Sequence, residues 1–534
     1  MRAITIVLAT LGLAYAAAAS AAPDPGSPTV TTAAGRIEGI GAPGGVSAFL
    51  GIPYAAPPVR ELRWRDPQPA VRWTGTYHAD RLPPQCIQPL RAGETNQYPG
   101  ADVTSEDCLY LNVWTKPGLR KAPVVVFIHG GGFFIGSSRM PLYAGEQVAQ
   151  RGAVFVNLNY RLGVLGFLAH PALSAESPHK TSGNYAFLDQ IAALKWVKAN
   201  IARFGGDPDN VTIAGQSAGS MSVLALQASP LTRGLFQRAV GMSGALLGSG
   251  GPGAMRPLAD GEREGARFLD LMKAKSLAAL RLMPADRLVV PRVPGSPSVG
   301  PIQDGYVLPT PVEQAFADRR QNDVPLLLGF ARDESLGGMG PVKDLADYRA
   351  RVAERFGTRA EQFLTLYPAA TDAEAREQAR LADRDATMVG AMKSWATLQT
   401  RYGTAPVYSY MFARPHSYVP GVTFPDLDPA TAGAYHTSEV PYWLGTLDSF
   451  NLYRKTRAWT PADRAFSATM TDALIAFARS GTPGTAWPRF DPAAPKLVEL
   501  GQTMRTGDWP DERRLAFFRD TPAPTRPAGG ALRD

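Results

Sequence analysis

Apolar residues in this chain gather in short unbroken runs rather than in alternation with polar ones. Such runs occur at 124–128, 154–158, 211–214, 325–330 and 407–412. Because they are rich in β-branched residues and lack a period of two, they predict strands buried on both faces. This pattern is typical of a mostly parallel sheet.

Between these runs the spacing of apolar residues predicts helices. Over 187–201 the apolar positions recur at intervals of three and four, which lines one face of a helix. A second helix is predicted over 462–479. Thr460 stands at its N-cap, Pro461 at its first helical position and Gly481 just past its end. Strands that alternate with helices favour the α/β fold class.

The composition narrows the class of protein further. The chain has 534 residues, of which 45% are hydrophobic, enough to form a large core, so a disordered or fibrous protein is excluded. Length alone suggests about three domains. Its 53 glycines and 47 prolines indicate many loops and argue against a helical bundle. The net charge of +8 is spread along the chain, so nucleic-acid binding is not expected.

The N-terminus has the features of a secretory signal peptide. Arg2 supplies a positive charge, 4–19 is almost wholly apolar, and Ala19-Ser20-Ala21 offers small residues for cleavage. We therefore expect a signal peptide over 1–21 and a secreted or periplasmic protein. No later apolar run reaches about 18 residues, so no transmembrane anchor is expected.

Cysteine usage fits export. The two cysteines, Cys86 and Cys108, lie 22 residues apart in a polar stretch. In an oxidising compartment they would most simply form a disulfide, with two buried free thiols as the alternative.

The strongest chemical motif is Gly-Gln-Ser-Ala-Gly at 215–219, which follows a predicted strand and opens a helical stretch. This is the setting of a nucleophile elbow, in which glycines allow a tight turn and the serine projects from it. Ser217 would stand at a helix N-terminus, where backbone N–H groups favour developing negative charge. We identify Ser217 as the candidate nucleophile.

A nucleophilic serine needs a base and an acid. If the chain order of this motif holds, of the six histidines only His416 and His436 lie late enough to be the base, and spacing favours His436. The acid is expected after the strand at 325–330, where Asp333 and Glu334 are adjacent. The pattern alone does not separate these two carboxylates.

An oxyanion site is expected after another strand. The segment His-Gly-Gly-Gly-Phe at 129–133 follows the run at 124–128, and its glycines let backbone N–H groups approach a substrate. Gly131 and Gly132, with the N–H of Ala218, are the candidate oxyanion donors. The chain carries no P-loop, H-E-x-x-H or calcium-loop pattern, so no cofactor or metal is expected.

With these motifs the sequence resembles the type-B carboxylesterases, the carboxylesterase and cholinesterase family of α/β-hydrolases. Further blocks that carry the resemblance are Phe-Leu-Gly-Ile-Pro-Tyr at 49–54, Glu-Asp-Cys-Leu-Tyr-Leu-Asn-Val at 106–113, Asn-Tyr-Arg-Leu-Gly at 159–163 and Phe-Gly-Gly-Asp-Pro at 204–208. The resemblance implies an α/β-hydrolase fold with long gorge-forming insertions, and hence one domain over 22–534 rather than three.

The resemblance also implies site residues. It assigns Ser217 as nucleophile and His436 as base. The family's Asp-Glu-Gly block falls on 333–335, which makes Glu334 the acid, with Ser335 in place of the usual glycine. It pairs Cys86 with Cys108, and it identifies Ser243 as a serine that hydrogen-bonds near the triad.

The expected activity is hydrolysis of small-molecule carboxylic esters through an acyl-enzyme. The choline esterases of the family stack their substrate cation on a tryptophan in the cysteine loop. Here 87–107 contains none, so the resemblance implies that choline esters are not preferred substrates. Alternatives within the fold are a lipase or an esterase for polyacid esters of the fumonisin type, whose bacterial representatives the segment 168–173 resembles. A non-catalytic binding module is the alternative from another class. The sequence carries no indication of an oligomeric state.

Overall fold

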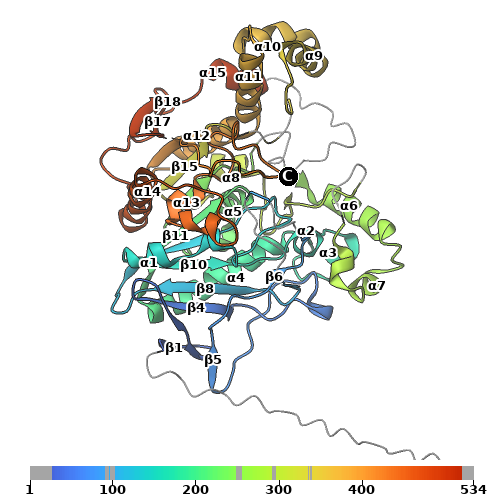
Figure 1. Ribbon diagram of the computed structural model, residues 1–534. Coiled ribbons are helices and arrows are strands. Elements are labelled where there is room, and N and C mark those ends of the chain that lie inside the picture. Colours follow the sequence, from blue (N-terminus) through green and yellow to red (C-terminus); the bar gives the residue numbers. More distant parts are fainter. Residues whose placement is uncertain are drawn as a thin grey trace, which may run out of the picture.

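The computed structural model describes residues 27–90, 95–96, 103–247, 255–290, 296–334, 336 and 339–519. The predicted signal peptide over 1–21 and Ser335 lie outside the described residues. Figure 1 shows the arrangement of the elements around a large central sheet.

Within the described residues, the central sheet has 11 strands in the order β18-β17-β16-β15-β12-β11-β9-β10-β8-β4-β3. Its parallel strands are β9 (Ala122–Ile128), β10 (Val154–Leu158), β11 (Gly206–Gln216), β12 (Arg238–Met242), β15 (Leu326–Ala331), β16 (Val407–Phe412) and β17 (Lys496–Leu500). The antiparallel edge strands are β3 (Ile40–Ala42), β4 (Val46–Pro53), β8 (Tyr110–Thr115) and β18 (Met504–Asp508).

The five predicted strands and their parallel pairing are therefore confirmed. β11 is longer than the predicted 211–214, because its polar first half also pairs with β9, and the register shifts between Gly206 and Val211. The small strands outside this sheet are β1 (Thr29–Thr32), β2 (Gly35–Glu38), β5 (Thr76–His78), β6 (Gln85–Cys86), β7 (Thr104–Ser105), β13 (Arg256–Pro257) and β14 (Ile302–Gln303).

Helices cover both faces of the sheet. The first half of the chain contributes α1 (Glu146–Gln150), α2 (Gly163–Phe167), α3 (Pro171–Glu176), α4 (Tyr185–Asn200), α5 (Ala218–Ala228), α6 (Leu258–Leu271) and α7 (Leu277–Arg281). The second half contributes α8 (Val312–Ala317), α9 (Leu345–Phe356), α10 (Ala360–Leu366), α11 (Asp372–Arg384), α12 (Gly390–Tyr402), α13 (Val440–Leu444), α14 (Pro461–Ser480) and α15 (Glu512–Arg519).

The strands alternate their side chains between two apolar cores. Val124 and Val126 face the core that α4, α5, α8 and α12 cover, whereas Val125 and Phe127 face the core under α1, α13 and α14. Both faces of the central strands are thus buried, as the unbroken apolar runs predict.

The two predicted helices differ in how closely they follow the pattern. In α14 the Thr460 side chain accepts from the Asp463 N–H, and Gly481 follows the last turn with φ 81°, so both predicted ends are confirmed. By contrast, the buried surface of α4 extends beyond the predicted apolar face. It includes the polar residues Asp189 and Gln190, which are fully buried.

Two smaller apolar clusters lie outside the main cores. α9–α11 and α15 pack together around Phe363 and Phe517 and project at one end of the molecule (Figure 1). α6 and α7 pack around Phe268 and Leu280 beside α2. Among the described residues no helix is both long and apolar enough to span a bilayer.

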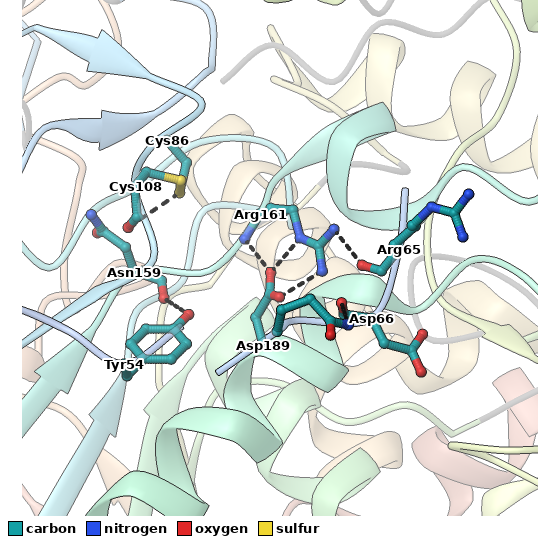
Figure 2. Close-up of polar contacts among 9 residues, drawn as sticks. Tyr54, Arg65, Asp66, Cys86, Cys108, Asn159, Arg161 and Asp189 are labelled. Atoms are coloured by element: carbon teal, nitrogen blue, oxygen red, sulfur yellow. Dashed lines mark hydrogen bonds and ion pairs between the residues drawn. A yellow bond between two sulfur atoms is a disulfide. The ribbon is translucent and has the colours of Figure 1, made fainter. Parts of the chain in front are cut away.

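A buried ion pair explains why Asp189 is tolerated inside the core. Arg161, in the loop after β10, donates from Nε and Nη2 to the two carboxylate oxygens of Asp189 at 2.8 and 2.7 Å. Its Nη1 donates to the Arg65 carbonyl at 2.9 Å, so all three guanidinium nitrogens of Arg161 donate hydrogen bonds (Figure 2). The side chains are 3% and 0% exposed.

We expect the substitution Arg161→Met to lower the free energy of unfolding by about 3–5 kcal/mol, because it leaves Asp189 buried without a counter-charge. Urea denaturation measures this change. The exposed Arg513 pairs with Asp511 at the surface, so Arg513→Met serves as the control and should leave the free energy of unfolding nearly unchanged. The double variant Arg161→Met/Asp189→Leu should recover most of the loss; no recovery would contradict the explanation by buried charge.

Candidate active site

Ser217 lies at a sharp turn between the end of β11 and the start of α5. Its φ of 57° and ψ of −123° are unusual for a residue with a side chain and store about 1–3 kcal/mol of strain. The turn is held by backbone hydrogen bonds: Ser217 N donates to Met242 O at 2.8 Å, and Met221 N donates to Ser217 O at 2.9 Å. This is the local geometry of a nucleophile elbow.

Glycines around the turn allow three backbone segments to meet. A Cβ on Gly215 would lie 2.3 Å from Gly219 O, and one on Gly219 would lie 2.0 Å from Ile128 O. A Cβ on Gly244 would lie 2.2 Å from Ser217 O. These close approaches explain why the tight turn predicted at 215–219 requires its two motif glycines.

The structure brings one of the two candidate histidines to one of the two candidate acids. His436 Nδ1 lies 2.9 Å from Glu334 Oε2, and the Glu334 side chain is fully buried. Asp333 instead accepts from Ala434 N at 2.7 Å and pairs with Arg332. The adjacent carboxylates thus point to different partners, which the sequence pattern could not distinguish.

His416, the other candidate base, has no contact with these acids. It is buried, and its Nε2 lies 2.8 Å from Ser438 O. Burial, followed by the nearby charge of Arg457, lowers the pKa of His416 to about 3, so this imidazole is neutral.

Behind the His436–Glu334 pair lies a second buried carboxyl group, Glu439. Ser243 Oγ lies 2.5 Å from Glu334 Oε1 and 3.0 Å from Glu439 Oε1. Because a hydroxyl has one proton, it can donate to only one of these oxygens. Burial, followed by the charge of Glu334, raises the pKa of Glu439 to about 7, so this carboxyl group is partly ionised near neutral pH.

The charge balance around His436 favours its protonated form more than in water. Burial lowers the pKa of His436. The charge and the hydrogen bond of Glu334, with a smaller contribution from Glu439, raise this pKa by more than burial lowers it, so the net shift is upward. At its other nitrogen, His436 Nε2 lies 3.3 Å from Gln216 Nε2. With Nδ1–H donating to Glu334, Nε2 is the nitrogen that accepts a proton.

The predicted oxyanion segment follows β9 and is shaped by its neighbours. Gly131 and Gly132 have φ values of 105° and 62°, and a Cβ on Gly131 would lie 2.1 Å from Ile135 O. His129 Nδ1 lies 2.8 Å from Gly130 O, and its ring stacks on Tyr160 with centroids 4.4 Å apart. Burial lowers the pKa of His129 to about 4, so a neutral ring donates to that carbonyl.

The disulfide joins Cys86 and Cys108, as expected. Near this disulfide, Gln88 contacts the chain just after the oxyanion segment. Gln88 Nε2 donates to Gly136 O at 2.9 Å, and Gly136 N donates to Gln88 Oε1 at 2.8 Å. Over the part of the chain that the structure describes, no group of three or more His, Cys, Asp or Glu side chains is arranged to hold a metal ion.

Sequence reasoning missed Glu439, Gln216 and Gln88. Glu439 lies three residues after His436, and Gln216 stands directly before Ser217. Proximity in the chain could have drawn attention to both. Gln88 has no such signal, because its contact with Gly136 spans 48 residues.

Comparison with known proteins identifies the class to which this fold and site belong. The carboxylesterase family model matches residues 26–518, nearly the whole chain. The chain therefore belongs to the carboxylesterase family of α/β-hydrolases, and it is a carboxylic ester hydrolase.

Individual relatives agree with this class. The chain is 38% identical to fumonisin B1 esterase of Sphingopyxis macrogoltabida over 89% of this chain and 87% of that one. It is 34% identical to para-nitrobenzyl esterase of Bacillus subtilis (strain 168), covering 92% of this chain and 98% of the relative. A solved structure of PNB esterase superposes with a TM-score of 0.76 and 32% identity, covering 93% of this chain and 99% of the other.

We expect Gly219→Ala to lower the free energy of unfolding by about 1–3 kcal/mol and to reduce ester turnover, because its methyl group would displace Ile128 O. Gly41→Ala is the matched control, since nothing lies within 4 Å of a Cβ at that position. Denaturant unfolding and turnover of a p-nitrophenyl ester measure both effects. Equal stability of the two variants would contradict the close approach described for the elbow.

Proposed function

We propose that the protein is an exported serine carboxylesterase that acts through Ser217, His436 and Glu334 and a covalent acyl-enzyme. The observation that carries the proposal is the 2.9 Å contact between His436 Nδ1 and Glu334 Oε2, together with the φ of 57° of Ser217 on the elbow. A base oriented by a buried acid and a serine on a strained turn are the two parts that nucleophilic catalysis requires.

In the first half-reaction Ser217 Oγ attacks the ester carbonyl carbon, and its proton passes to His436 Nε2. Glu334 stabilises the imidazolium through the Nδ1–H hydrogen bond. The electron pair of the carbonyl π bond moves to oxygen, and the N–H groups of Gly131, Gly132 and Ala218 bind this oxyanion. Each such donor contributes about 3 kcal/mol in the transition state.

Collapse of this intermediate breaks the bond to the alcohol, which leaves with the proton from His436 Nε2. Water then attacks the acyl-enzyme and gives its proton to the same nitrogen. The second tetrahedral intermediate expels Ser217 Oγ, which recovers that proton, and the carboxylic acid is released. The cycle needs no cofactor.

Export is supported by the Cys86–Cys108 disulfide, because disulfides persist in oxidising compartments. The predicted signal peptide over 1–21 agrees with it, and the mature protein would be periplasmic or secreted. We also infer one catalytic domain over 22–534, since the family match runs across both smaller apolar clusters.

A second candidate substrate class is polyacid esters. It is favoured by the relative named fumonisin B1 esterase, at 38% identity over 89% of this chain. Turnover of a panel that includes short-chain p-nitrophenyl esters, aryl esters and tricarballylate esters would separate the two classes. A kcat/KM for the polyacid esters above that for the simple esters would favour the second.

We expect Ser217→Ala to lower kcat by about 10⁴- to 10⁶-fold, because the nucleophile is lost while the fold is kept. Covalent labelling by a fluorophosphonate probe should also disappear. Ser480, at the exposed end of α14, provides the control Ser480→Ala, which should keep normal turnover and labelling. Normal turnover by Ser217→Ala would overturn the assignment, and a folded wild-type protein that hydrolyses no ester would favour a non-catalytic binding module.

We expect Glu439→Gln to move the acid limb of the pH profile of kcat/KM to lower pH. The base must be neutral, so activity rises as pH passes the pKa of His436, and the charge of Glu439 helps to raise that pKa. Removing this charge lowers the pKa of His436, and the variant becomes active at lower pH. The exposed Glu361→Gln is the control with no expected shift. An unmoved or upward-shifted acid limb would contradict the coupling.

A further inference from the structure

The loop that carries His436 has a strained backbone and is held by hydrogen bonds from buried side chains. Thr437, the next residue, has a φ of 81°, which a residue with a branched side chain rarely adopts. Backbone strain of this kind persists only where the surroundings hold it in place. The residues that hold this loop therefore matter for where the imidazole of His436 points.

One buried imidazole holds the loop on both sides of His436. His416 Nε2 lies 2.8 Å from Ser438 O, and Tyr435 Oη lies 3.1 Å from His416 Nδ1. Since the carbonyl oxygen of Ser438 only accepts, Nε2 carries the proton and Nδ1 accepts. The loop segment 435–438 is thus attached to His416 at its first and its last residue.

His416 is itself held by Arg457. Arg457 Nε donates to His416 Nδ1 at 3.1 Å, and the Arg457 residue is 1% exposed. Its guanidinium lies over the rings of Tyr418 and Phe450, 4.3 and 4.6 Å from their centroids. Across the described residues no carboxylate forms an ion pair with Arg457. Ring faces and neutral acceptors surround this buried cation, which is unusual in a folded protein.

The same guanidinium reaches the disulfide loop. Arg457 Nη2 donates to Asn96 Oδ1 and lies 3.4 Å from Tyr435 Oη. Asn96 is 6% exposed, and its backbone N–H donates to Asp426 Oδ1 at 2.8 Å. Gln88 binds Gly136, three residues after the oxyanion segment, so the described residues between Cys86 and Cys108 contact both the chain next to that segment and the support of His436.

We propose that Arg457 and His416 are positioning residues for ester hydrolysis, which hold the His436 loop and join it to the disulfide loop through Asn96. This role rests on the proposed function of His436 as the base. The arginine fork is essential to it, because a lysine ammonium lacks the planar set of donors that reaches His416 and Asn96 together. Neither residue touches the substrate; both act through the orientation of the imidazole.

The test compares folded variants of the full chain. Arg457→Met removes the fork at similar volume, and His416→Phe keeps a ring but removes both polar atoms. His416→Gln retains an amide that can donate to Ser438 O. Arg454→Met is the matched control, because Arg454 lies three residues before Arg457 and is exposed. Asn96→Ala tests the link to the disulfide loop with a small change, should Arg457→Met fail to fold.

The readouts are kcat and KM for a p-nitrophenyl ester and the rate at which a fluorophosphonate labels Ser217. We expect Arg457→Met and His416→Phe to lower kcat and the labelling rate about 10- to 100-fold, with KM changed less than about twofold. Because they act in one chain of contacts, the double variant should be no worse than the poorer single one. His416→Gln should recover most of the loss, Asn96→Ala should show a smaller loss, and Arg454→Met should behave as the wild type.

Three results would overturn the proposal: wild-type kcat in the folded variants, a change confined to KM, or multiplied losses in the double variant. If Arg457→Met does not fold, a wild-type kcat in both His416→Phe and Asn96→Ala would also overturn the proposal. Failure of the proposed function is recognised separately, because the wild-type protein would then show neither turnover nor labelling. In that case the positioning role falls with it.

Discussion

Close contact between backbone segments at the ends of β9, β11 and β12 is the constraint on which the site depends. Gly219 lies against Ile128 O and Gly244 against Ser217 O, at separations that leave no room for a Cβ. These contacts force the chain to reverse at Ser217 and to enter α5 directly. Ser217 therefore lies at the N-terminus of α5, at the carboxyl end of β11. The oxyanion segment begins at the carboxyl end of the neighbouring β9, so the same packing orders both parts of the site.

Electrostatics around His436 follow from burial more than from surface charge. Glu334 and Glu439 are both fully buried, and Ser243 lies between them. Two ionised carboxylates so close together in a low-dielectric interior would repel strongly, and the raised pKa of Glu439 relieves that repulsion. The net charge of +8, spread over the chain, has no visible part in this arrangement.

Segments far apart in the chain support the two ends of the site. Gln88 contacts the segment after the triple glycine, and Asn96 contacts Arg457, 361 residues away. A disulfide that closes the loop around both residues limits the conformations of the unfolded chain, and in the folded state it keeps both anchors near their partners. Gln88 thus lies against the chain next to the oxyanion segment, and Asn96 against the support of the His436 loop.

Local patterns in the sequence determined much of this protein. The β-branched runs predicted the central strands, the capping residues at Thr460 and Gly481 predicted the ends of α14, and the glycine motif at 215–219 predicted the elbow, because each of these depends on neighbours in the chain. The family resemblance assigned Glu334 rather than Asp333, but the local pattern did not separate them, since adjacent carboxylates have the same local signal. The tertiary structure supplies the physical difference, because His436 lies across from Glu334, whereas Asp333 accepts from Ala434 N. The role of Glu439 beside Ser243 and the burial of Arg457 also arise from contacts between distant segments, which no periodicity in the sequence records.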